Sequence, residues 1–180
     1  DIHATKDNEF VCFHDFTLNR LFKIKKSIKN LRYNELQNII RTKKTKIPLL
    51  RDLLRLSKNK HDLFIEIKPM FSKKLLKKLI KETNKFKKCV FISFKEENIY
   101  RLLKIKKTIN IGLSFTVNTS IKTIIKKSKN KYIDYLILDK FFLNNKNIKK
   151  IDKKKYFYTI KNKKEFLKYN KNHNLIFENL

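Results

Sequence analysis

DIHATKDNEFVCFHD, residues 1–15, is the stretch from which the rest of the chain is interpreted. Successive side chains of a strand point to opposite faces, so Asp1, His3 and Thr5 are expected to share one face of a first strand. The Asp7-Asn8 pair that follows predicts a turn, because both residue types tolerate the left-handed backbone conformation at low cost. The stretch therefore predicts two short extended segments joined by a tight turn.

The second extended segment covers residues 9–13 and ends at His14 and Asp15. A carboxylate on one strand, here Asp1, and a histidine just past the next strand suit metal binding and proton transfer. Taken alone, Asp1 is also explained as a solvated terminal residue, and His14 as a surface histidine at a strand end. The residues of this stretch leave both interpretations open.

Beyond this stretch, extended and helical patterns alternate along the chain. Strands are predicted at residues 62–68, 88–94, 109–115, 132–138, 156–160 and 174–177, and helices at 34–40, 47–54, 72–85, 96–107, 120–129, 145–152 and 163–170. Asn34 and Ser72 are the expected N-caps of two of these helices, and Pro48 suits the first turn of another. The alternation is typical of an α/β domain with parallel strands.

The strand DLFIEIK, residues 62–68, places Phe64, Glu66 and Lys68 on one face and aliphatic side chains on the other. In a barrel the aliphatic face packs under helices and the other face points inward, with Glu66 and Lys68 near the C-terminal mouth. A carboxylate in an apolar strand is costly unless it is paired or binds a metal, which favours a functional Glu66. Lys68 is otherwise explained as one more solvated lysine.

The chain has 180 residues, 41% of them hydrophobic, which predicts one globular domain spanning residues 1–180. Its formal net charge is +30, from 46 Lys and Arg against 16 Asp and Glu. Nearly all the basic residues are lysines spread through every segment, whereas nucleic-acid readers use arginine and stacked aromatics. We therefore expect no specific nucleic-acid partner. Cys12 and Cys89 are expected to be reduced thiols, and no apolar run reaches the roughly 18–20 residues of a membrane span.

The first twenty residues, DIHATKDNEFVCFHDFTLNR, resemble the signature of the glycerophosphodiester phosphodiesterases. That signature is an acidic-x-Asp pair, Thr-Lys-Asp-Gly, a short apolar strand and His-Asp-x-Thr-Leu-x-Arg. Asn8 stands where the family has glycine, a change that the turn accepts. The resemblance continues through nearly the whole chain, including Glu-Ile-Lys at residues 66–68. It implies hydrolysis of a small-molecule glycerophosphodiester to glycerol 3-phosphate and an alcohol.

The resemblance also implies roles for individual residues. Asp1 matches the second acid of the metal-binding pair, Glu66 the third metal acid, and His14 the second of two catalytic histidines. Lys68 matches a lysine that contacts phosphate. Tyr158 stands where the family has a tryptophan and keeps an aromatic wall for the substrate. Carboxylate ligands suit a divalent metal, Mg²⁺ or Ca²⁺.

A TIM (β/α)8-type barrel needs eight strands, and the sequence offers seven besides residues 9–13. By resemblance, the first βα unit carries the other catalytic histidine and the first metal acid. We therefore expect an N-terminally trimmed barrel that lacks its first βα unit and is inactive by itself, from a protein expected to be cytoplasmic. The alternatives are another phosphodiesterase of the phospholipase C-like barrels, a degenerate inactive barrel, and a basic module that binds anions or nucleic acid.

Overall fold

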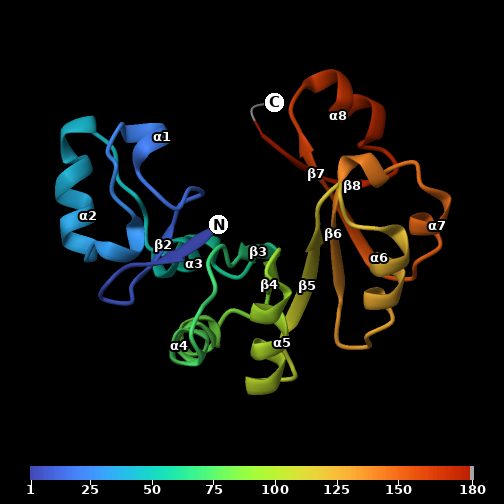
Figure 1. Cartoon of the computed structure of the whole chain (residues 1–180), viewed down its shortest axis with the longest axis horizontal. Coiled ribbons are helices and arrows are strands. Elements are labelled where there is room, and N and C mark those ends of the chain that lie inside the picture. Colours follow the sequence, from blue (N-terminus) through green and yellow to red (C-terminus); the bar gives the residue numbers. More distant parts are fainter. Residues whose placement is uncertain (179–180) are drawn as a thin grey trace.

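The computed structural model describes residues 1–178, and a curled parallel sheet of six strands is its centre (Figure 1). The strands, which are neighbours in chain order, are β3 (Leu63–Glu66), β4 (Cys89–Ser93), β5 (Asn110–Phe115), β6 (Tyr135–Asp139), β7 (Lys154–Ile160) and β8 (Asn174–Phe177). Each lies where the sequence predicts one. β6 begins at Tyr135 and not at Tyr132, because the amide of Tyr132 bonds the Asn130 side chain and that of Ile133 the Asn130 carbonyl.

Residues 1–12 form the predicted hairpin, with β1 (Ile2–Ala4) antiparallel to β2 (Phe10–Cys12). Asn8 has φ of 61°, which confirms the left-handed turn position. β1 also continues the main sheet beyond β3, since Ile2 lies opposite Ile67 in parallel orientation. The hairpin thus brings residue 1 to the same edge as the carboxyl end of β3.

Helices α4 (Lys73–Thr83), α5 (Glu96–Ile105), α6 (Ile121–Ser128), α7 (Lys146–Lys149) and α8 (Lys163–Tyr169) lie along the outside of the sheet (Figure 1). Their buried faces meet the outward side chains of the strands, among them Ile65 and Ile67, in the largest apolar cluster. The predicted N-cap Ser72 is confirmed, because its hydroxyl accepts from the amide of Leu75. The outer layer therefore follows from the amphipathic pattern of the sequence.

The inner face of the sheet has an aromatic core of its own. Phe64 packs edge-on against Tyr135, with ring centroids 5.4 Å apart, and lies 4.6 Å from the Tyr156 ring. Gly112 is the single glycine of the chain, and a Cβ there would lie 2.9 Å from the Cβ of Tyr135. A larger residue at Gly112 would push this ring out of place. The prediction that Phe64 and its neighbours of the same parity face inward is confirmed.

Residues 13–58 lie beside the hairpin. Their first part packs around a second apolar cluster that includes Leu18, Leu36 and Ile40, whereas Leu50 and Leu54 belong to the largest cluster. Their elements are α1 (Asn19–Phe22), η1 (Ile28–Asn30), α2 (Tyr33–Ile40), η2 (Arg41–Lys43) and α3 (Leu50–Ser57), and a further short turn, η3 (Lys140–Phe142), follows β6. Figure 1 shows this segment, in blue and cyan, to the left of the sheet.

Two helix starts differ from the prediction. Asn34 is not the cap of α2, which begins at Tyr33, because the Asp7 carboxylate accepts from the Tyr33 amide and the Glu35 carboxylate from the Arg32 amide. Pro48 precedes α3 instead of lying in its first turn, since its carbonyl accepts from the amide of Cys12 in β2. In both places a contact with the hairpin sets the helix start.

Candidate functional site

A cavity of about 330 Å³ opens at the carboxyl ends of the parallel strands. Its lining residues come from the hairpin segment and from five strands of the parallel sheet or their ends, and they are Asp1, His14, Phe64, Glu66, Lys68, Ile92, Phe94, Ile137, Tyr158, Thr159, Ile176 and Glu178. All five residues that the sequence singled out are among them. The carboxyl edge of a parallel sheet is where α/β barrels place their chemistry.

An ammonium group lies between two carboxylates in this cavity. The Lys68 Nζ is 3.1 Å from Glu66 Oε1 and 3.6 Å from Asp1 Oδ1. Because both oxygens are this close to one nitrogen, the Asp1 and Glu66 carboxylates lie well under about 10 Å from each other. Two carboxylates further apart than that could not both bind one metal ion. Lys68 and Glu66 are each only 16% exposed, so the charges are partly withdrawn from water. Asp1 is therefore placed in the site, and Lys68 is not a solvated surface lysine.

The two carboxylates fit a hard divalent cation by donor type, because Mg²⁺ and Ca²⁺ prefer oxygen ligands. Within residues 1–178, no group of three or more His, Cys, Asp or Glu side chains is positioned to hold one ion. Asp1 and Glu66 share the cavity with one further carboxylate, that of Glu178.

Asp15 links His14 to Arg20 in a second set of polar contacts. Its Nδ1 lies 2.6 Å from Asp15 Oδ1, and the Arg20 guanidinium donates to both Asp15 oxygens at 2.6 and 3.1 Å. The Arg20 guanidinium and the His14 ring lower the pKa of the Asp15 carboxyl to about 2, so it is ionised at neutral pH. A carboxylate at Nδ1 fixes the orientation of the ring and leaves Nε2 available for proton transfer.

His3 packs against the loop that carries His14. It is 3% exposed, its Nε2 lies 3.3 Å from the His14 carbonyl oxygen, and its ring meets Phe16 edge-on at 5.0 Å. Burial lowers the pKa of His3, which therefore stays neutral at pH 7. His3 is consequently a structural residue that positions the His14 loop.

Tyr158 and Phe94 form an aromatic wall of the cavity, with ring centroids 5.5 Å apart. The Tyr158 hydroxyl donates to the Phe115 carbonyl oxygen at 3.0 Å, and burial raises the pKa of its phenol well above the ordinary range. The ring is therefore fixed and stays protonated, while its face remains available to the cavity.

A buried amide holds the loop that follows Glu66 and Lys68. Asn98 is fully buried in α5; its Oδ1 accepts from the Phe71 amide at 3.0 Å and its Nδ2 donates to the Pro69 carbonyl at 2.9 Å. Beside it, the Ser93 hydroxyl donates to the Ile67 carbonyl at 2.7 Å. Both side chains thus fix the backbone that carries the charged pair.

Replacing Asn98 by alanine is expected to lower the free energy of unfolding by about 3 kcal/mol, because it leaves the Phe71 amide and the Pro69 carbonyl buried without partners. Urea unfolding followed by circular dichroism measures this loss. Asn84→Ala is the matched control, since the exposed Asn84 makes one surface contact, to Lys106, and its removal should cost less than about 0.5 kcal/mol. Equal losses in the two variants would contradict the role given to Asn98.

Sequence reasoning missed part of this arrangement. Arg20 and Asn98 received no role, because their partners are set by the loop path and by helix packing. The Asp15 contact could be expected only from its adjacency to His14. Glu178 also lines the cavity, just after β8, whereas His61 and His173 do not.

The fold of this chain is similar to that of several solved structures, among them three phosphodiesterases. They are a glycerophosphodiester phosphodiesterase from Thermotoga maritima (TM-score 0.79, 19% identity), a phosphodiesterase from Oleispira antarctica in complex with the product sn-glycerol-3-phosphate (0.80, 17%), and a glycerophosphodiester phosphodiesterase from Agrobacterium tumefaciens C58 (0.71, 17%). The alignments cover 98%, 98% and 99% of this chain and 78%, 78% and 81% of those chains. At this identity the likeness shows the fold alone, an α/β fold whose curled parallel sheet of six strands is consistent with a TIM-like barrel.

Other comparisons concern the sequence and the helices. No curated protein sequence matches the chain. Within residues 1–178, none of the helices has the length and apolar content that crossing a bilayer requires. In a scan against protein-family models, residues 1–175 match the glycerophosphoryl diester phosphodiesterase family. Because this match spans almost the whole chain, the protein belongs to the glycerophosphoryl diester phosphodiesterase family.

Proposed function

We propose that the protein hydrolyses a glycerophosphodiester to glycerol 3-phosphate and an alcohol with the help of a bound divalent metal, Mg²⁺ or Ca²⁺. The observation that carries the proposal is the placement of Asp1, Glu66, Lys68 and His14 around one cavity at the carboxyl end of the sheet. Family membership supports the reaction class. The Oleispira antarctica phosphodiesterase, which contains sn-glycerol-3-phosphate, supports a ligand of this size in the fold.

The phosphate end of the substrate is assigned to the charged pair. Asp1 and Glu66 would hold the metal, which supplies charge neutralisation on the phosphate oxygens and lowers the pKa of bound water. Lys68 is already held between the two carboxylates, so its ammonium is positioned to donate to a phosphate oxygen without a search for the right rotamer. These residues bind and orient the phosphodiester.

The leaving alcohol is assigned to His14. With Nδ1 held by the ionised Asp15, the ring orientation is fixed and Nε2 remains available for proton transfer to the alcohol oxygen. Because the ring is 57% exposed on its own, substrate binding is what would cover it and exclude water from the transfer. The group attached to the alcohol would lie against the wall formed by Tyr158 and Phe94.

Other parts of the proposal do not rest on the cavity. A single domain over residues 1–180 is inferred from length and composition. A further βα unit ahead of residue 1, which supplies another histidine and another metal acid, is inferred from the family resemblance, and a cytoplasmic location is a further prediction. If the extra unit is required, residues 1–180 are inactive by themselves and the chain extended upstream is active. These points stay predictions.

The test is release of glycerol 3-phosphate from glycerophosphocholine by the full natural chain, with Mg²⁺ or Ca²⁺ and with excess chelator. We expect turnover that the chelator abolishes and added metal restores. A folded, metal-supplied chain that releases no glycerol 3-phosphate from any glycerophosphodiester would favour the second candidate, a degenerate binding barrel. Turnover insensitive to the chelator would refute the metal role of Asp1 and Glu66.

A further inference from the structure

Large apolar side chains are exposed around the entrance of the cavity. We define the apolar rim as five of them, with exposed fractions from 40% to 71%: Phe16, Met70, Phe94, Val117 and Phe141. Phe141 is the most exposed of these at 71%, and Phe16 is 52% exposed. Side chains of this size are normally buried, and a group of them on the surface marks a site of interaction.

The topology places the rim at one edge of the molecule. Met70 follows β3, Phe94 follows β4 directly, Val117 follows β5 and Phe141 follows β6. The strands are parallel, so these positions all lie beyond their carboxyl ends. Phe16 joins them through its contact with His3, beside His14. The rim therefore surrounds the opening through which a substrate reaches the acids.

The opposite end of the sheet provides a comparison. The exposed residues Leu56 and Tyr132 precede β3 and β6, so they lie toward the amino ends of the strands. Leu56 is 77% exposed and Tyr132 is 38% exposed, values similar to those of Phe141 and Val117. The two pairs differ in which end of the barrel they occupy, which makes them matched positions for substitution.

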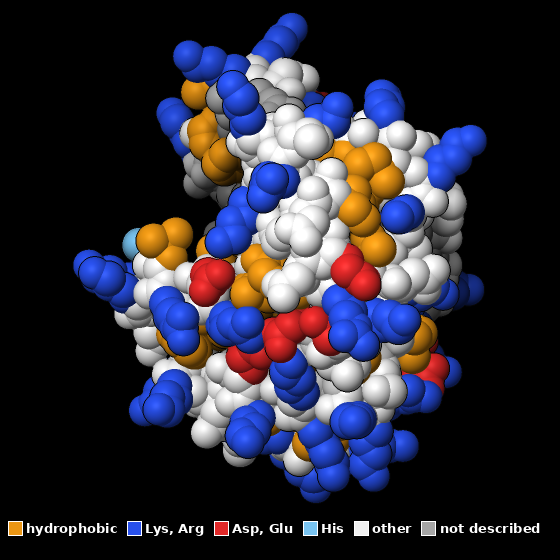
Figure 2. All heavy atoms as spheres, turned by 90° about the vertical axis from the view of Figure 1, so that its left-hand side faces the viewer, with side chains coloured by type: hydrophobic (Ala, Val, Ile, Leu, Met, Phe, Trp, Pro, Cys, Tyr) orange, Lys and Arg blue, Asp and Glu red, His pale blue; other side chains and the backbone are white. Residues whose placement is uncertain are grey.

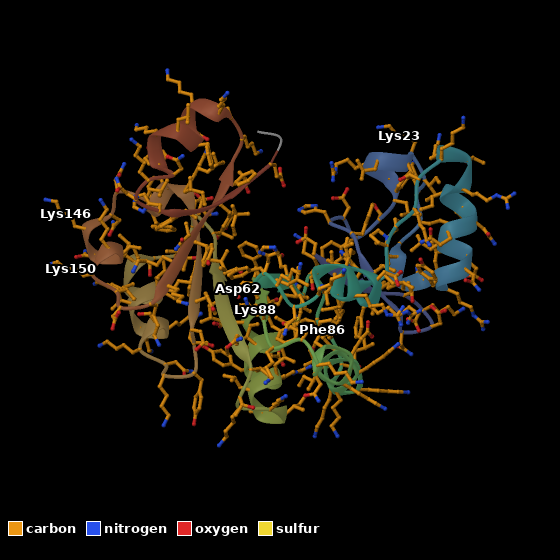
Figure 3. All side chains as sticks on the ribbon, turned by 180° about the vertical axis from the view of Figure 1, so that it is seen from behind. Lys23, Asp62, Phe86, Lys88, Lys146 and Lys150 are labelled. Carbon is orange, nitrogen blue, oxygen red and sulfur yellow. The ribbon has the colours of Figure 1, made fainter. Side chains whose placement is uncertain are left out.

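Basic side chains accompany the rim. Exposed lysines follow rim positions in the chain by one to five residues, namely Lys73, Lys95 and Lys122, and the net charge is +30. Figure 2 shows lysine and arginine side chains spread over one face of the molecule, with apolar patches and a group of acidic side chains among them, and Figure 3 shows Lys23, Lys146 and Lys150 at the periphery of the molecule. An anionic lipid surface binds proteins in two ways: apolar side chains insert into the bilayer interface, and lysines contact the lipid phosphates.

We propose that the apolar rim docks on the surface of an anionic lipid bilayer, from which the cavity takes a lipid-borne glycerophosphodiester. The proposal rests on the proposed function, since the same cavity performs the hydrolysis. Water bonds to phosphorus through its oxygen and releases one proton to the solvent, the bond from phosphorus to the alcohol oxygen breaks, and that oxygen takes a proton from His14, which the solvent then reprotonates. The apolar wall of Phe94 and Ile137 connects the rim to the acids and suits a substrate with a hydrocarbon portion.

The test compares two double variants of the full chain that change charge equally, Phe141→Asp with Val117→Asp and Leu56→Asp with Tyr132→Asp. Co-sedimentation is measured with vesicles of phosphatidylcholine alone and mixed with phosphatidylglycerol. We expect the wild-type protein to bind the mixed vesicles, the rim pair to weaken binding by about tenfold or more, and the control pair to bind nearly as the wild type does. Hydrolysis of soluble glycerophosphocholine should be unchanged in both pairs.

Docking would be overturned if the wild-type protein did not bind the mixed vesicles, or if the two pairs of substitutions weakened vesicle binding equally. It would also be overturned if salt removed vesicle binding entirely, or if the rim pair changed only self-association or DNA binding. Hydrolysis of glycerophosphocholine without vesicle binding would refute docking and leave the proposed function intact. Vesicle binding without hydrolysis of any diester would refute the proposed function and leave docking intact. The two ideas therefore fail separately.

Discussion

Replacing His14 by alanine is expected to lower the turnover of glycerophosphocholine by about 10²–10⁴-fold, the usual effect of losing a general acid. The alkoxide that leaves the phosphate is a strong base, so departure without a proton donor is slow. His14 lines the cavity with its Nδ1 already bonded to Asp15, which leaves Nε2 for the transfer. Steady-state release of glycerol 3-phosphate by the full natural chain, supplied with metal, measures the change.

Two further variants separate chemistry from folding. His61→Ala removes an exposed histidine that lies before β3, outside the cavity, and should leave turnover unchanged. Asp15→Asn keeps the shape but removes the carboxylate that holds His14 Nδ1 and the Arg20 guanidinium, so it should lower turnover. Wild-type turnover from a folded His14→Ala protein would disprove the assignment.

The order of strands and helices could be predicted from the sequence, because each strand is an apolar run and each helix has a regular apolar face. Glu66 and Lys68 could be placed in the cavity for the same reason, since parity along residues 62–68 decides which face they occupy. Periodicity does not report contacts between distant segments. The start of α2 depends on Asp7, and the loop after Lys68 depends on Asn98, so neither was expected.

The net charge could not be used to predict where a partner binds. A net charge of +30 is a property of composition, and composition does not say where partners bind. The exposed phenylalanines carry that information, because burial of a large apolar side chain is favourable and its exposure must be explained. Their position is visible only when the carboxyl ends of the strands are brought together, which is why the apolar rim was not expected from the sequence.

Replacing Glu66 by glutamine is expected to abolish metal-dependent turnover, the larger of the two effects. The amide keeps the size and one acceptor oxygen but removes the negative charge that a divalent ion requires, and Asp1 then remains as a single carboxylate beside the Lys68 ammonium. The same variant should lose the rise in melting temperature that Mg²⁺ or Ca²⁺ gives the wild-type protein, because an ion that binds only the folded state stabilises it.

The matched control for that experiment is Glu165→Gln. Glu165 makes the same kind of ion pair, with its Oε1 2.7 Å from the Lys140 Nζ, and it does not line the cavity. It should therefore keep both turnover and the metal-induced rise in melting temperature. Loss of turnover in Glu66→Gln with the metal-induced rise intact would mean that Glu66 orients Lys68 toward the phosphate and does not hold the metal. Chelator-sensitive turnover at the wild-type rate in Glu66→Gln would remove Glu66 from the site altogether, because no protein ligand to the metal can lose its charge without weakening the ion's binding.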